Sequence, residues 1–89
     1  MSSGKFSAFE LKPNQWYRVT AEFVDFDRIV HPVGECWRYH SRDFYPHEAG
    51  LRLNVEGEGL KSIRLQDYHG VQREIIDRFS DYVVETQPT

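Results

Sequence analysis

The stretch Leu51-Arg52-Leu53-Asn54-Val55-Glu56 alternates apolar and polar side chains without interruption, and Gly57-Glu58-Gly59 leads from it into Ile63-Arg64-Leu65. Successive side chains of a β-strand point to opposite faces, so this alternation gives each segment one apolar and one polar face. Two alternating segments joined by a glycine-rich turn are typical of an antiparallel hairpin. We therefore expect two strands here, each with one buried face.

The same period of two extends upstream of this hairpin. Between Trp16 and Phe26, one face of the predicted strand carries Tyr17, Val19, Ala21 and Phe23. Asp25 and Asp27 favour a turn, so this strand is expected to end at 25–28. β-Branched residues return in 29–31, which predicts a second strand and a hairpin. Residues 32–35 form a second turn because Pro32 cannot donate to a ladder and Gly34 accepts a positive φ.

A third strand is expected over residues 35–41. Trp37 and Tyr39 share one face of it and should point inward, whereas the opposite face carries Cys36, Arg38 and His40. Residues 44–50 read as a loop anchored by aromatic side chains, since Pro46 and Gly50 punctuate it.

Past Asp67 the apolar period changes from two to 3.6. The spacing of Val71, Ile75, Phe79, Tyr82 and Val83 predicts one amphipathic helix over 71–83, with Asp67 as its N-cap. The fold class that follows is α+β and mainly β: a small, strongly bent antiparallel sheet or SH3-like barrel of about five strands with a C-terminal amphipathic helix. A flat sheet covered by that helix is the alternative.

One compact core is expected in all of these arrangements. Its predicted members are Tyr17, Val19, Phe23, Trp37, Tyr39, Leu51, Leu53, Val55, Ile63, Leu65, Ile75 and Phe79. We expect residues 1–11 to form a flexible N-terminal arm, 12–84 a single β-rich domain, and 85–89 a frayed tail.

Composition excludes several classes of protein. The chain has 89 residues, 15% of them aromatic, which is far too many for a disordered chain. Its net charge of −3 fits neither a strongly basic nucleic-acid binder nor an acidic mimic of duplex DNA. A single cysteine, Cys36, cannot form an internal disulfide, and no apolar run suits a signal peptide or a membrane span. We expect a cytoplasmic protein.

The side chains that could carry chemistry do not assemble into a reaction centre. Cys36 and His40 on one extended strand would lie about 13 Å apart, too far to share a metal ion. The sequence identifies no base that would activate the Cys36 thiol. Asp25 and Asp27 are expected to cap the turn at 25–28 rather than to act as an acid and base pair. We expect no enzymatic activity, no cofactor and no metal.

A local basic face is the feature most suggestive of binding. It is predicted to carry Arg38, His40 and Arg42, together with Arg52 on a neighbouring strand and Tyr45 in the adjoining loop. The planar guanidinium group of arginine suits carboxylates, and exposed aromatic side chains anchor protein partners. A protein-binding module or an inhibitor of antitoxin type is therefore expected. Single-strand nucleic-acid binding on a small barrel is the alternative, which the net charge disfavours. A metal-dependent or thiol enzyme is a weaker third hypothesis.

The sequence offers two further candidate interaction surfaces. Acidic side chains gather at the predicted hairpin ends, namely Glu22, Asp25, Asp27, Glu56 and Glu58, and they could instead meet a basic partner. Unpaired sheet edges make a homodimer possible. No membrane association is expected.

The chain also resembles a small bacterial family classed as a domain of unknown function. The similarity spans residues 11–83 and rests on a Tyr-Arg-Val strand, Phe-x-Asp-Phe-Asp, His31-Pro32-x-Gly34-Glu35-x-Trp37, Phe44-Tyr45-Pro46, Gly50-Leu51 and a closing strand and helix. The resemblance implies a compact bacterial β-rich domain, and it transfers no catalytic or binding residues. Arg28 stands where this resemblance leads us to expect glycine.

Overall fold

The structure is a computed structural model that describes residues 5–57, 59–67 and 70–87. Its main element is a five-stranded antiparallel sheet with the strand order β6-β5-β4-β1-β7. The bounds of these strands are β1 (Trp16–Val19), β4 (Cys36–Tyr45), β5 (Gly50–Gly57), β6 (Leu60–Gln66) and β7 (Val83–Thr86).

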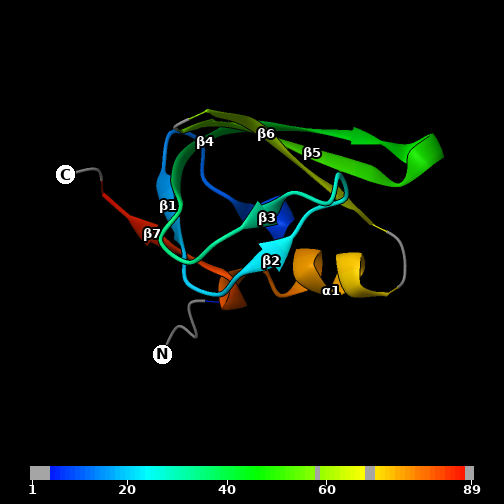
Figure 1. Ribbon diagram of the computed structural model, residues 1–89. Helices are drawn as coiled ribbons and strands as arrows, with labels where there is room; N and C mark the ends of the chain where they lie inside the picture. Colours follow the sequence, from blue (N-terminus) through cyan, green and yellow to red (C-terminus); the bar gives the residue numbers. More distant parts are fainter. Residues whose placement is uncertain (1–4, 58, 68–69, 88–89) are drawn as a thin grey trace.

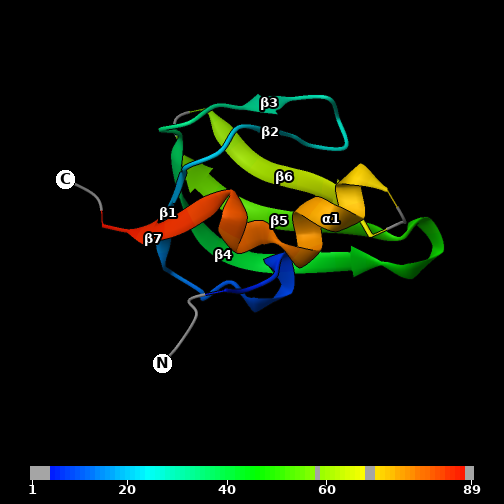
Figure 2. The ribbon, with the colours of Figure 1, turned by 90° about the horizontal axis from the view of Figure 1, so that it is seen from below.

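A second sheet contains only β2 (Phe23–Val24) and β3 (Val30–His31), which form an antiparallel hairpin. The one α-helix described is α1 (Val71–Asp77), and three short 3-10 segments are η1 (Ala8–Glu10), η2 (Pro46–Glu48) and η3 (Phe79–Asp81). The sheet is strongly bent, and α1 and the β2–β3 hairpin lie together on its concave side (Figure 1, Figure 2).

The expected fold class is confirmed. The protein is a small mainly-β fold with an antiparallel five-stranded sheet and a C-terminal helix. The sheet is not closed into a barrel, because β6 and β7 form its two edges. Among the described residues no helix has the length and apolar character needed to cross a membrane.

Every residue of the predicted core is buried. The core cluster also contains Ala8, Leu11, Ile76 and Val83. The largest side chains are fully enclosed, with Tyr17 and Trp37 in ring contact at 5.6 Å and Trp37 stacked near Phe79 at 6.3 Å. The period-two strands therefore place their apolar faces on one common interior.

The prediction of a single helix over 71–83 is wrong. Helix α1 ends at Asp77, η3 follows, and Val83 to Thr86 form strand β7 against β1. Val83 is buried, as expected, but it belongs to a strand and not to a helix. The β-branched residues Val83 and Val84 favour an extended backbone, and they pair with the side of β1 that β4 leaves open. Val71 is 74% exposed and the N-cap is Gly70 rather than Asp67.

The chain ends also differ from expectation. Ala8 and Leu11 of the predicted arm are buried, and η1 is fixed by a capping box in which Ser7 Oγ accepts from Phe9 N–H while Glu10 accepts from Ser7 N–H. Glu85 and Thr86 of the predicted tail belong to β7. Residues 1–4 and 88–89 lie outside the described residues.

A β-bulge at His40 decides which side chains of β4 face outward. Tyr39 pairs with Val55 and Ser41 with Asn54, so His40 is an extra residue on β4. Side chains opposite each other share a face, and Arg42 and Phe44 therefore lie on the concave face opposite buried Leu53 and Leu51.

Candidate functional site

The structure does not bring the five residues of the predicted basic surface onto one face. Arg38, His40, Tyr45 and Arg52 lie on the outer side of the sheet, but Arg42 lies on the concave side, with its guanidinium 5.8 Å from the Phe9 ring centroid. The expected outward series Arg38, His40, Arg42 is thus wrong at Arg42, because the bulge reverses the alternation after His40.

Arg38 and His40 share one acidic partner. Arg38 Nη2 and His40 Nε2 lie 2.8 and 3.1 Å from the same Glu56 oxygen. The hydrogen bond from Arg38, followed by that from His40, holds the pKa of the Glu56 carboxyl below its usual value. This end of the outer face is therefore largely compensated in charge.

Arg52 is held more firmly, between a carboxylate and an aromatic ring. Its Nη2 donates to Asp43 Oδ2 at 2.9 Å, and its guanidinium lies 5.7 Å from the Tyr45 ring centroid. Asn54 Nδ2 donates to the same Asp43 oxygen at 3.0 Å. The hydrogen bonds from Asn54 and Arg52 lower the pKa of Asp43, and the bond to Asp43 raises the pKa of Arg52.

Arg64 forms a second arrangement of the same kind, which the sequence interpretation missed. Arg64 is directly opposite Arg52 in the β5–β6 register. Its Nη1 donates to Asp27 Oδ1 at 3.2 Å, and its guanidinium lies 5.7 Å from the Phe26 ring centroid. The alternation of 51–65 could have placed Arg64 beside Arg52, whereas the contact with Phe26 spans 38 positions and has no local signal.

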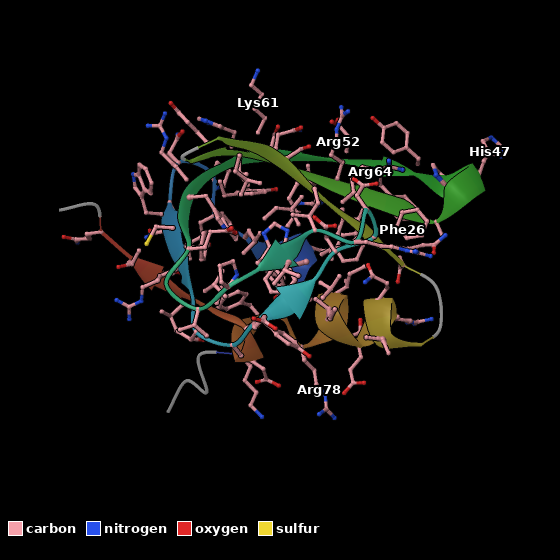
Figure 3. The ribbon with its side chains drawn as sticks, in the orientation of Figure 1. Phe26, His47, Arg52, Lys61, Arg64 and Arg78 are labelled. Carbon is pink, nitrogen blue, oxygen red and sulfur yellow. The ribbon has the colours of Figure 1, made fainter. Side chains whose placement is uncertain are left out.

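These side chains line two hollows, which we call together the arginine–aromatic cleft. The larger, of about 560 Å³, is lined by Phe26, Pro46, His47, Ala49, Gly50, Arg64, Leu65 and Gln66. The smaller is lined by Tyr45, His47, Arg52 and Arg64. Since His47 and Arg64 line both, the hollows adjoin at the end of the sheet where Figure 3 shows His47, Arg64 and Phe26.

The register explains why the sheet surface is hollowed here. Gly50 lies between Tyr45 and Gln66 in the row that crosses β4, β5 and β6, so this row has no side chain at its centre. Arg52 belongs to the next row, between Asp43 and Arg64. Tyr45 and Phe26 stay 42% and 44% exposed, which leaves part of each ring available to a ligand.

Phe26 is held in place by a buried polar cluster in the β2–β3 hairpin. His31 is fully buried, and its ring nitrogens Nε2 and Nδ1 lie 2.8 Å from Asp25 Oδ2 and 2.6 Å from Glu35 Oε1. The other Asp25 oxygen accepts from the backbone N–H groups of Asp27 and Ile29, so Asp25 caps the turn as expected but does so from the interior. Phe26 N–H in turn donates to Arg64 O at 2.7 Å.

The remaining candidates from the sequence do not converge on a reactive centre. His31 is 0% exposed, so a substrate cannot reach it in this conformation. Cys36 is exposed, with its thiol 3.5 Å from Gly34 O. Within 5–57, 59–67 and 70–87, no group of three or more His, Cys, Asp or Glu side chains is arranged to hold a metal ion.

The acidic hairpin ends are also dispersed. Asp25 is buried, Asp27 is paired with Arg64, and Glu56 is paired with Arg38. Glu58 lies outside the described residues.

Comparison with solved structures identifies a similar protein. An integron cassette protein from the mobile metagenome of Vibrio cholerae superimposes with a TM-score of 0.80 and is 30% identical in sequence. The match covers 85% of this chain and 88% of that one. No family model and no curated protein matches the chain. The expected similarity to a small bacterial protein family is thereby confirmed.

Proposed function

The chain belongs to the same family as this Vibrio cholerae integron cassette protein, and we propose that it is a non-enzymatic binding protein that holds an acidic segment of another protein in the arginine–aromatic cleft. Inhibitors of antitoxin type are one form that such a binding protein takes. The proposal concerns the class of ligand and the surface that meets it.

The observation that carries the proposal is the pairing of Arg52 with Arg64. They are direct cross-strand neighbours, and like charges in that position repel each other. Asp43 and Asp27 each accept from only one terminal nitrogen of the arginine beside them, while a guanidinium has several N–H donors. A carboxylate that bridges the two arginines would use the remaining donors and relieve the repulsion.

Both guanidinium groups are also fixed in orientation before a ligand arrives. Each is held by one carboxylate and one aromatic ring, and the side chains are 41% and 45% exposed. Binding to side chains that are already ordered loses less conformational entropy than binding to mobile ones. Arginine and aromatic residues together are the usual anchors of protein interfaces.

The larger hollow supplies the apolar part of the recognition. Phe26, Pro46 and Leu65 line it beside Arg64 and His47. An acidic segment with an apolar side chain next to its carboxylate would therefore place the carboxylate at the arginines and the apolar group against Phe26.

Single-strand nucleic-acid binding is supported less well. One face of the Tyr45 ring and one of the Phe26 ring already lie under a guanidinium, which leaves fewer surfaces on which bases could stack. The net charge of −3 also disfavours a nucleic acid, because binding a phosphate backbone depends on the summed positive charge of many contacts.

The test is a selection of random peptides displayed on phage, followed by titration of a labelled synthetic copy of the best peptide. We expect the selected peptides to be rich in Asp and Glu with adjacent apolar residues. The double variant Arg52→Gln, Arg64→Gln should weaken binding of that copy about a hundredfold, because two charge-assisted contacts are lost. Arg78→Gln is the matched control, since Arg78 is exposed and lies on the opposite side of the molecule (Figure 3).

Two results would contradict the proposal. One is unchanged affinity in the double variant while its thermal unfolding matches that of the wild type. The other is selection of peptides without acidic residues. A labelled oligothymidine that binds at low salt and is displaced by no acidic peptide would favour the nucleic-acid alternative instead.

A further inference from the structure

The outward face of the β2–β3 hairpin is unusually apolar. Apart from Phe26, which lies in the arginine–aromatic cleft, the exposed apolar side chains of the hairpin and of the turn that follows it are Val24 at 41%, Ile29 at 49%, Val30 at 50% and Val33 at 64%. Single exposed apolar residues are common on protein surfaces, but a group gathered on one short element marks an interaction site.

The inner face of the hairpin explains why these side chains point outward. Phe23, Asp25 and His31 are buried, and strand alternation then forces Val24 and Val30 to the opposite face. Val24 and Val30 are direct cross-strand partners, so they form one continuous apolar surface. Helix α1 flanks this surface through the bond from Gln72 Nε2 to Val24 O, and Figure 2 shows the hairpin as the outermost layer on its side of the molecule.

The two ends of the hairpin carry opposite charges. Glu22 lies at its base, directly before β2, and Arg28 lies in the turn at its tip. Both are exposed, and neither has an ion-pair partner within the part of the chain that the structure describes. The apolar valines lie between these two charges along the hairpin.

We infer that a second copy of this chain packs its hairpin face to face on this one. A two-fold axis near Val24 and Val30 would bring the two apolar surfaces together at the spacing of stacked sheets, about 10 Å. The same axis reverses the direction of the second hairpin. Glu22 would then oppose Arg28 of the partner subunit at one end, and Arg28 would oppose Glu22 of the partner subunit at the other.

The arrangement of charge favours a second copy over an unrelated partner. An isologous interface must be complementary to itself, which requires each charge to meet its opposite after rotation by 180°. An acidic end, an apolar centre and a basic end meet that requirement. This inference does not depend on the proposed function, and it differs from association through the sheet edges, where β7 would supply the contact.

Sedimentation velocity over micromolar to millimolar concentrations tests the inference. We expect the wild type to associate to a dimer. Val30→Glu and Val24→Glu place a charge at the centre of the interface and should leave the protein monomeric. Because both valines are already half exposed, the variants should remain folded, which circular dichroism checks. Val84→Glu, on β7 and 36% exposed, is the matched control and should still dimerise.

A charge exchange provides the sharper test. Glu22→Arg alone and Arg28→Glu alone should each weaken the dimer about tenfold or more, because like charges then meet at both ends. The variant that carries both changes should regain dimerisation. An equimolar mixture of the two single variants should also form dimers, since each subunit then meets opposite charges.

A wild type that stays monomeric at millimolar concentration would overturn the inference. So would a dimer that persists in Val30→Glu but dissociates in Val84→Glu, because the interface would then lie at the β7 edge. Failure of the charge exchange to restore association would exclude the two-fold arrangement.

Discussion

His31 is the residue on which the hairpin geometry depends most. Both of its ring nitrogens face carboxylate oxygens, at 2.8 Å for Asp25 and 2.6 Å for Glu35, and its ring stacks on Phe23 with centroids 4.7 Å apart. Both distances are within hydrogen-bond range, so the ring is fixed from both sides. A buried group of this kind adds little net stability when complete, but removal of one member leaves an uncompensated polar group in the interior.

Replacement of Asp25 by Ala should therefore be strongly destabilising. We expect the free energy of unfolding to fall by about 3–5 kcal/mol, since His31 and two backbone N–H groups lose their common hydrogen-bond partner together. Urea denaturation measures the change. Asp27→Ala, two residues away, is the control and should cost less than about 1 kcal/mol because its bond to Arg64 is exposed. Equal losses for the two variants would contradict this account of the buried cluster.

At the scale of the element, the β-bulge in β4 has the largest effect on the surface. With His40 as the extra residue, Ser41, Asp43 and Tyr45 join the outer face, and Arg42 joins the concave face. Asp43 then reaches Arg52, and Tyr45 lies beneath its guanidinium. The extra residue His40 thus determines which side chains reach the cleft, although Tyr45 is the one residue of β4 in the cleft lining.

Deletion of His40 should be tolerated, whereas deletion of Arg42 should not. Without His40, Ser41 follows Tyr39 directly and every later pair with β5 is kept, so the loss should be about 1 kcal/mol, comparable to the exposed contact with Glu56. Without Arg42, the ladder can close only by turning Ser41 to the concave face or by moving Asp43 there. Either way the contact of Arg42 with Phe9 is lost, so the loss should exceed that of the His40 deletion. Thermal and urea unfolding of the two deletions distinguish them, and an equal or reversed order would show that the bulge does not set the register.

The whole molecule is a single small interior closed by distant parts of the chain. Its Cα radius of gyration is 12.2 Å, close to the value of about 12 Å that scaling gives for a folded domain of this length. Residues from η1, α1, η3 and β7 complete the core that the strands begin, including Ala8, Ile76, Phe79 and Val83. A core of this size gives a small free energy of unfolding, so a cavity in it should remove a large part of the stability.

Leu53 is fully buried at the centre of β5, and its replacement by Ala tests that expectation. We expect a loss of about 2–5 kcal/mol, against a total stability of about 4–13 kcal/mol for a chain of this length. Differential scanning calorimetry should show a much lower melting temperature. Val71→Ala, a change at a side chain that is 74% exposed, should leave the melting temperature almost unchanged.

Sequence alone determined the elements whose pattern is local. The alternation in 51–65 and the inward positions of Trp37 and Tyr39 follow from the period of the strand, and the predicted core is buried throughout. The turns at 25–28 and 32–35 follow from their Asp, Pro and Gly residues. Arg52 was identified as a surface residue from the strand period and Tyr45 as part of a loop, although Tyr45 in fact ends β4; both line the arginine–aromatic cleft.

Only the tertiary structure decided the features that join distant segments. The bulge at His40 depends on the register with β5, the end of α1 at Asp77 depends on the open side of β1, and the contact of Phe26 with Arg64 depends on how the hairpin meets β6. Periodicity reports which face of an element is apolar. It does not report which neighbour that face meets or where an extra residue shifts the pairing, because those outcomes are set by packing across the whole core.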